Sequence, residues 1–185
     1  MNIAPTRFLP SILMTIALVA ANTEAAADAI SSTALGQRTM SKFMVNLASF
    51  VTWPEDRFVS ESAPYKYCMM GDDPFAGAFD TAVTDKQTNN RGFQIERIGL
   101  EDMDAAKNCH VVFVNVPDAT KALNIIDSLE GLPILTVGEV ENFAQYGGMV
   151  GFLGEGRKIA LAVNQQRLEN AGLKGSSRLY RASDM

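Results

Sequence analysis

The first 27 residues constrain this chain most, because they have the order of a secretory signal, which is removed and never joins the fold. Arg7 supplies a positive charge, residues 8–21 form an apolar run, and small residues end the segment at positions 25–27. The run is about 14 residues long, whereas a membrane-spanning helix needs about 20. We therefore predict export of the chain, with cleavage near Ala27 or, as a second site, after residues 19–21. An uncleaved membrane anchor is the alternative.

The remaining residues, 28–185, are predicted to form one domain. Their length of about 158 residues is typical of a single domain with a substantial core. The signal carries one cation, Arg7, and one anion, Glu24, so the net charge of −5 is the same with and without it. A mildly acidic domain argues against binding to nucleic acids and against polybasic binding to membranes. Export also separates the chain from the nucleotide cofactors of the cytoplasm.

The two cysteines, Cys68 and Cys109, have three candidate states. In an oxidising compartment the simplest state is one disulfide, whose loop of about 42 residues stabilises a fold by about 4 kcal/mol. Free thiols are the second state. The third is a metal site completed by His110, the only histidine. His110 directly follows Cys109, and neighbouring residues of a strand point to opposite faces, which argues against a shared metal ion.

Helical and extended patterns alternate along the predicted domain. Apolar residues recur at a spacing of three and four, or follow capping residues, in the segments expected to be helical. These segments are residues 31–52, 74–83, 102–107, 119–129, 140–146 and 164–171. Runs of β-branched and aromatic residues predict strands at residues 65–70, 93–98, 111–114, 134–137, 149–153 and 158–163. Residues 176–182 have no clear pattern.

This order of elements predicts a single-domain α/β fold. Strands that alternate with helices favour a mainly parallel sheet with helices on both faces. The last two predicted strands are separated only by residues 154–156, a Gly-Glu-Gly turn. We therefore expect them to form an antiparallel hairpin at one edge of the sheet.

No combination of residues predicts an enzyme. A Ser-His-Asp triad needs a base that reaches a nucleophile, but His110 opens an apolar strand and no Gly-x-Ser-x-Gly sequence occurs. Asp72 and Asp73 are of the residue type that holds Mg²⁺, yet the following Pro74 favours a helix cap. The glycines within residues 147–156 lack the strand–turn–helix order of phosphate-binding loops. We expect no catalytic residues, no metal site and no cofactor.

An aromatic segment, Phe50 to Pro54, ends the first predicted helix and contains the only tryptophan, Trp53. One interpretation is a hydrophobic lock that fixes the helix to the core. The other is a partly exposed contact surface, because Trp and Phe are favoured at the centres of protein interfaces. On the second interpretation we expect Phe50, Trp53, Pro54 and Arg57 among the contact residues, with Arg178 near the C-terminus as a further candidate.

Six short blocks of the sequence together resemble a known family. The blocks are Met44 to Pro54 (MVNLASFVTWP), Cys68 to Phe75 (CMMGDDPF), Cys109 to Phe113 (CHVVF), Leu135 to Val137, Gly147 to Val150, and Gly172 to Leu179. They occur in the order found in the YfiR-like periplasmic family and extend over about residues 35–182. Six blocks in the right order are a strong signal, although each alone is weak.

The resemblance implies an exported α/β protein, often dimeric, with a disulfide between Cys68 and Cys109. The best-understood member of the family binds the periplasmic sensor domain of an inner-membrane diguanylate cyclase. Binding holds that enzyme off, so less cyclic di-GMP is made and biofilm formation is restrained. A second disulfide of that member has no counterpart here, because the chain has only two cysteines. We therefore do not expect redox sensing through a second disulfide.

Two functional hypotheses follow. On the first, the chain is a periplasmic regulator, not an enzyme, that works as a homodimer and inhibits a membrane-bound diguanylate cyclase. On the second, it is a periplasmic small-molecule binding module that serves another membrane sensor. Because parallel α/β sheets bind ligands beyond the carboxyl ends of their strands, the second hypothesis predicts a ligand near Gly71 and Asp72, Asn115, and residues 137–138.

Overall fold

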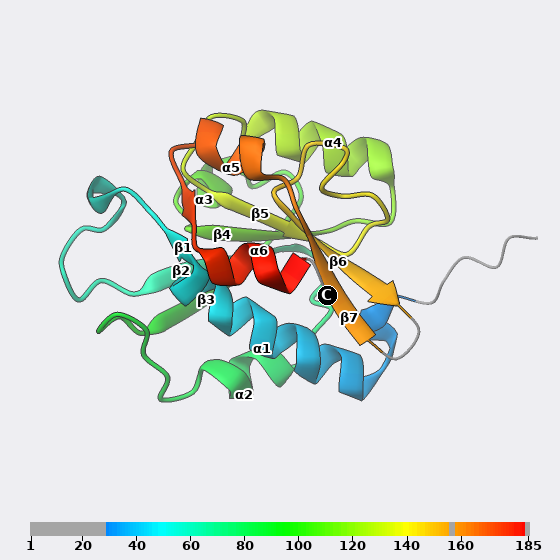
Figure 1. The fold of residues 1–185 in the computed structure, drawn as a ribbon, viewed down its shortest axis with the longest axis horizontal. Coiled ribbons are helices and arrows are strands. Elements are labelled where there is room, and N and C mark those ends of the chain that lie inside the picture. Colours follow the sequence, from blue (N-terminus) through cyan, green and yellow to red (C-terminus); the bar gives the residue numbers. More distant parts are fainter. Residues whose placement is uncertain (1–28, 156–157, 184–185) are drawn as a thin grey trace, which may run out of the picture.

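A computed structural model describes residues 29–155 and 158–183 of the chain (Figure 1). The predicted signal, residues 1–27, and its two cleavage sites lie outside the described residues. The described part is an α/β fold in which a twisted six-stranded sheet lies between two groups of helices. The predicted fold class is therefore confirmed.

The large sheet has the strand order β3-β2-β4-β5-β6-β7. Its strands are β2 (Tyr65–Gly71), β3 (Phe93–Ile98), β4 (Val111–Asn115), β5 (Leu135–Gly138), β6 (Val150–Glu155) and β7 (Lys158–Val163). Neighbouring strands from β3 to β6 are parallel, and β6 and β7 form the predicted antiparallel hairpin at one edge. In the central strand β4, Val111 through Val114 are fully buried, because helices cover both faces of the sheet there.

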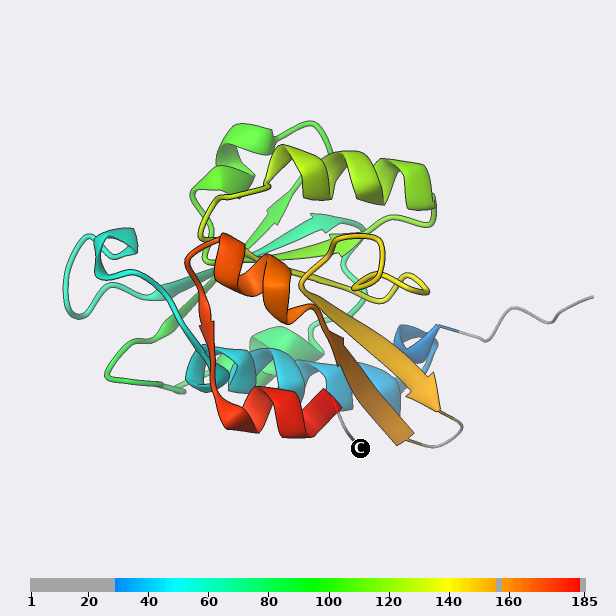
Figure 2. The ribbon, with the colours of Figure 1, turned by 45° about the horizontal axis from the view of Figure 1, so that its top comes forward.

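The helices are α1 (Ala34–Phe50), α2 (Ala78–Val83), α3 (Met103–Lys107), α4 (Ala119–Ser128), α5 (Gln165–Asn170) and α6 (Ser177–Ser183), with short 3-10 turns η1 (Ile30–Ser32) and η2 (Glu55–Arg57). One core contains Met44 of α1, Phe79 of α2 and Leu179 of α6. A second core, on the opposite face of the sheet, contains Ala106 of α3 and Ile126 of α4. Figure 2 shows the two groups of helices on either side of the sheet, as predicted.

Besides the first helix, which ends earlier than predicted, two of the predicted helices are wrong in part or in whole. The helix expected from Pro74 begins only at Ala78. The Asp73 carboxylate accepts a hydrogen bond of 2.8 Å from the Phe75 N–H, and Ala76 and Gly77 have φ of 47° and 81°, so the chain turns before it can become helical.

The helix expected over residues 140–146 is a series of turns. Asn142 has φ of 59°, a left-handed conformation that interrupts a right-handed helix. The turns place the ring of Phe143 directly over Gly138 and Gly148, where a Cβ on either glycine would collide with it. The Phe143 ring therefore packs against two glycines, and this packing fixes residues 140–146 as turns in place of the predicted helix.

A second, two-stranded sheet was not predicted from the sequence. The first helix was expected to continue to Thr52, but it ends at Phe50, and β1 (Val51–Thr52) pairs antiparallel with β8 (Lys174–Gly175). The Ser176 N–H extends this contact with a hydrogen bond of 2.7 Å to the carbonyl of Phe50. The C-terminal segment, which had no clear pattern, continues from this sheet into α6.

Candidate functional site

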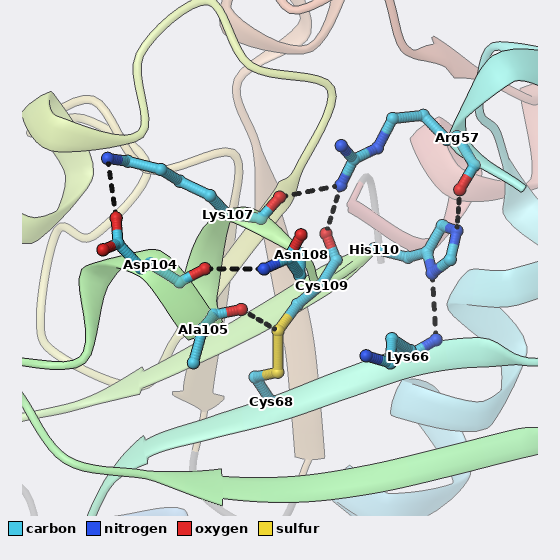
Figure 3. Close-up of a disulfide and its surroundings, with 9 residues drawn as sticks. All are labelled: Arg57, Lys66, Cys68, Asp104, Ala105, Lys107, Asn108, Cys109 and His110. Atoms are coloured by element: carbon cyan, nitrogen blue, oxygen red, sulfur yellow. Dashed lines mark hydrogen bonds and ion pairs between the residues drawn. A yellow bond between two sulfur atoms is a disulfide. The ribbon is translucent and has the colours of Figure 1, made fainter.

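The two cysteines form a disulfide that joins neighbouring strands of the sheet (Figure 3). Cys68 lies within β2, and Cys109 lies two residues before β4, which pairs with β2. Their Cα atoms are 6.1 Å apart, and both residues are fully buried. The disulfide is therefore the correct one of the three candidate states, and the free thiols and the Cys-His metal site are wrong.

His110 lies beside the disulfide but joins a different set of contacts (Figure 3). The Lys66 N–H donates to its Nδ1 at 2.9 Å, so the ring proton is on Nε2, which is 3.2 Å from the carbonyl of Arg57. Burial, followed by the positive charge of Arg57, lowers the pKa of His110 to about 4. The imidazole is therefore neutral and bonded through both nitrogens, as expected of a residue that fixes the end of a strand.

Trp53 has the geometry of the predicted hydrophobic lock. Its side chain is only 5% exposed, and its indole N–H donates to the carbonyl of His110 at 3.0 Å. The indole also packs against Tyr65, with ring centroids 5.5 Å apart. Because so little of the ring reaches the surface, Trp53 positions its neighbours and offers almost no contact area of its own.

Phe58, which no sequence pattern indicated, joins Trp53, Tyr65 and His110 in one aromatic cluster. Its ring stacks on His110, with centroids 4.4 Å apart and planes 19° apart. The guanidinium of Arg91 lies 3.8 Å from the Phe58 centroid and donates to the carbonyls of Ser60 and Ala63. No spacing or motif connects these residues in the sequence, since Arg91 reaches Phe58 from a distant loop.

A cavity of about 220 Å³ opens beside the aromatic cluster. Its lining consists of Val51, Thr52, Trp53, Glu55, Phe58, Tyr65, Asn89 and Arg91. The lining combines three aromatic side chains with one carboxylate and one guanidinium. Such a mixture can hold a small polar molecule that has an apolar part.

The predicted contact residues fall into two groups. Phe50 and Pro54 are half-buried and Arg178 is exposed. The Ser176 N–H binds the carbonyl of Phe50, so α6, which carries Arg178, begins beside the end of α1. Phe50, Pro54 and Arg178 therefore lie near the junction of β1, β8 and α6.

Arg57 belongs to the other group. Its guanidinium donates to the carbonyls of Lys107 and Cys109, at 3.2 Å and 2.8 Å, and so points toward the disulfide (Figure 3). These bonds tie η2 to the loop that precedes β4. Arg57 therefore joins two segments of the fold.

The carboxyl ends of the parallel strands, where the second hypothesis expects a ligand, are closely packed. A Cβ on Gly71 would collide with the carbonyl oxygen of Asn115. The Asn115 side-chain amide donates to the carbonyl of Asp72 at 2.8 Å, and the ring of Phe143 covers Gly138. These contacts hold the ends of β2 and β4 together, and the cavity beside Phe58 lies elsewhere.

The sequence of the chain was compared with models of known protein families. A family model described as YfiR/HmsC-like matches residues 37–183. The chain belongs to the YfiR/HmsC-like family. The resemblance seen in the six sequence blocks is therefore confirmed.

The YfiR/HmsC-like match extends from the first turns of α1 to the last residue of α6. It includes both sheets, the disulfide and the aromatic cluster. Among the helices of the described residues, none is both long and apolar enough to cross a membrane.

Proposed function

We propose that this protein is an exported regulator that binds the periplasmic sensor domain of an inner-membrane diguanylate cyclase and holds the enzyme inactive. The observation that carries the proposal is the YfiR/HmsC-like match over residues 37–183, nearly all of the described chain. The predicted signal at residues 1–27 supports export, because the regulator must meet a domain outside the cytoplasm.

The surface formed by Phe50, Pro54 and Arg178 supports a docking role. An aromatic ring and a guanidinium are the side chains that most often carry binding energy in protein interfaces. The segment that bears Phe50 and Pro54 is held rigidly, because Trp53 is bonded to the strand behind it. A rigid surface loses little conformational entropy when it binds.

Inhibition requires a preference for one state of the partner. Moving a cyclase domain from almost entirely active to almost entirely inactive takes about 5.5 kcal/mol of differential binding. A few well-packed side chains can supply that much, since single interface residues contribute about 2 kcal/mol or more. The proposal also includes the homodimer implied by the resemblance, which light scattering of the oxidised protein tests directly.

The experiment is deletion of the gene in its native host, with cyclic di-GMP measured by mass spectrometry. We expect the level to rise, and to fall again when the full-length chain is restored. A matched control lacks residues 1–27 and stays in the cytoplasm, so it should fail to restore the low level. An unchanged level in the deletion strain would overturn the proposal.

A second candidate function, binding of a small molecule, is favoured by the cavity beside the aromatic cluster. A ligand there would contact the ring edges of Phe58 and Tyr65 and lie close to the guanidinium of Arg91, because His110 and Arg91 already cover the faces of the Phe58 ring. Thermal-shift measurements with amino acids and vitamins test this candidate, since a ligand that binds only the folded state raises the melting temperature as its concentration increases. The variant R91Q should lose the shift, and a shift of the same size in R91Q would argue against this cavity.

A further inference from the structure

Three neighbouring elements of the fold carry cations but no carboxylates. Helix α1, strand β8 and helix α6 contain five cationic residues and no Asp or Glu. These residues are Arg38, Lys42, Lys174, Arg178 and Arg181, and all five are exposed. We call them the cationic face. The protein as a whole carries a net charge of −5, so the charge of these three elements is opposite in sign to that of the whole chain.

The arginines of this face differ from the others in what they bind. Elsewhere in the described chain Arg97 pairs with Asp73 and Asp80, Arg167 pairs with Asp127 and Glu130, and Arg57 and Arg91 donate to backbone carbonyls. Among the described residues, Arg38, Arg178 and Arg181 have neither an ion pair nor a side-chain hydrogen bond. Within the described part of the chain, the charges of these three arginines therefore pair with no other side chain.

The two helices of the cationic face lie side by side (Figures 1 and 2). Helix α6 begins where α1 ends, since the Ser176 N–H binds the carbonyl of Phe50, and the two then run in opposite directions. Both turn their apolar residues inward: Met44 of α1 and Leu179 of α6 are fully buried in the same core. Their cations are exposed, and the half-buried Phe50 lies at the end of α1 where α6 begins.

We propose that the cationic face docks an acidic protein surface on the membrane-bound partner. This inference rests on the proposed function and adds the chemistry of the partner. Exposed cations beside a half-buried aromatic residue are typical of protein interfaces, and complementary charge sets both orientation and association rate. The face includes Arg178 and adjoins Phe50, two of the contact residues expected from the sequence.

Two other occupants fit less well. A second copy of the chain, docked through the same face by two-fold symmetry, would bring cations against cations. A membrane would be held by charge alone, because the apolar side of α1 is buried in the core and cannot enter lipid. The net charge of −5 further opposes approach to an anionic bilayer.

The test in cells uses complementation of the deletion strain. We expect R178E/R181E and R38E/K42E to leave cyclic di-GMP near the deletion level, and R178K/R181K, which keeps the charge, to restore the low level. The matched control K86E/K121E reverses two exposed lysines, one in the loop after α2 and one on α4, and should complement fully. Immunoblots and circular dichroism confirm equal amounts and folding of every variant. Full complementation by both charge-reversed variants overturns the inference and leaves the proposed function standing.

An unchanged cyclic di-GMP level after deletion would overturn the proposed function but would not test the cationic face. A binding experiment tests the cationic face independently of that result. The oxidised protein is titrated at low salt with a short poly-L-glutamate peptide and, separately, with vesicles of phosphatidylethanolamine and phosphatidylglycerol. We expect peptide binding that weakens at least about tenfold in R178E/R181E and falls with added salt. An equal loss in K86E/K121E, or binding to vesicles without binding to the peptide, overturns it.

Discussion

The indole N–H of Trp53 and the backbone carbonyl of His110, which are 57 residues apart in sequence, are joined by a buried hydrogen bond of 3.0 Å. The bond ties the segment after α1 to the start of β4. Through it, the surface that carries Phe50 and Pro54 is fixed to the central strand of the sheet. The position of the proposed docking surface therefore depends on a residue that is itself hidden.

Replacement of Trp53 by Phe should reduce the free energy of unfolding by about 1–3 kcal/mol. The carbonyl of His110 loses one of its two donors and keeps only the Leu135 N–H, at 2.9 Å, and the smaller ring leaves part of a buried site unfilled. The change also removes the only tryptophan, so urea unfolding is followed by circular dichroism and not by indole fluorescence. The control is Val59→Ala, at a side chain that is 98% exposed, which should change stability very little. A W53F midpoint equal to that of the wild type would mean that the bond contributes nothing.

The region around Trp53 contains features that could be predicted from the sequence and features that could not. The aromatic segment, the strands and the alternation of elements were predictable, because local spacing and residue type determine them. The donor–acceptor pair was not, since nothing in the sequence connects Trp53 with the carbonyl of His110. The same is true of the two-residue strands β1 and β8, which are too short to produce a pattern.

The wrongly predicted helices have a related cause. At Ala76 and Asn142 the backbone adopts positive φ, which interrupts a right-handed helix; Asn accepts this conformation readily, whereas Ala does so at a cost. At Asn142 the turn is also fixed by Phe143, which packs over glycines of two other segments. Tertiary packing of this kind overrides local propensity, and a single sequence contains no direct sign of it.

His110 should make the protein less stable in mild acid. Its pKa is about 4 in the folded state and about 6.5 in the unfolded chain. Between these values the unfolded chain binds a proton that the folded protein does not, so the free energy of unfolding falls as the pH is lowered from 6.5 toward 4. The expected loss between pH 7 and pH 4.5 is about 2 kcal/mol.

The control for this prediction is His110→Asn, which keeps an acceptor for the Lys66 N–H but cannot titrate. The variant should be less stable than the wild type at pH 7. Its further loss between pH 7 and pH 4.5 should be smaller by about 2 kcal/mol, because only the other groups then respond. Identical pH profiles for the two proteins, measured by urea unfolding, would show that His110 does not carry the effect.

The disulfide between Cys68 and Cys109, 41 residues apart in sequence, should be a large part of the stability of the fold. Closing a loop of this length restricts the unfolded chain and stabilises the folded state by about 4 kcal/mol. We expect dithiothreitol to lower the unfolding midpoint of the wild type to that of C68A/C109A. The double variant serves as the control, since its midpoint should not respond to the reductant.

Gly71 and Gly77 have nearly the same backbone conformation. Alanine variants at these two positions therefore distinguish the cost of backbone strain from the cost of a steric collision. Gly71 has φ of 89° and Gly77 has φ of 81°, so alanine at either position is strained by about 1 kcal/mol. A Cβ at Gly77 would meet nothing within 4 Å, whereas a Cβ at Gly71 would collide with the carbonyl oxygen of Asn115 in the neighbouring strand. Gly71→Ala should therefore cost about 1–3 kcal/mol more than Gly77→Ala, as measured by urea unfolding. Equal costs would mean that β2 and β4 can separate without penalty at their carboxyl ends, which would reopen this region as a ligand site.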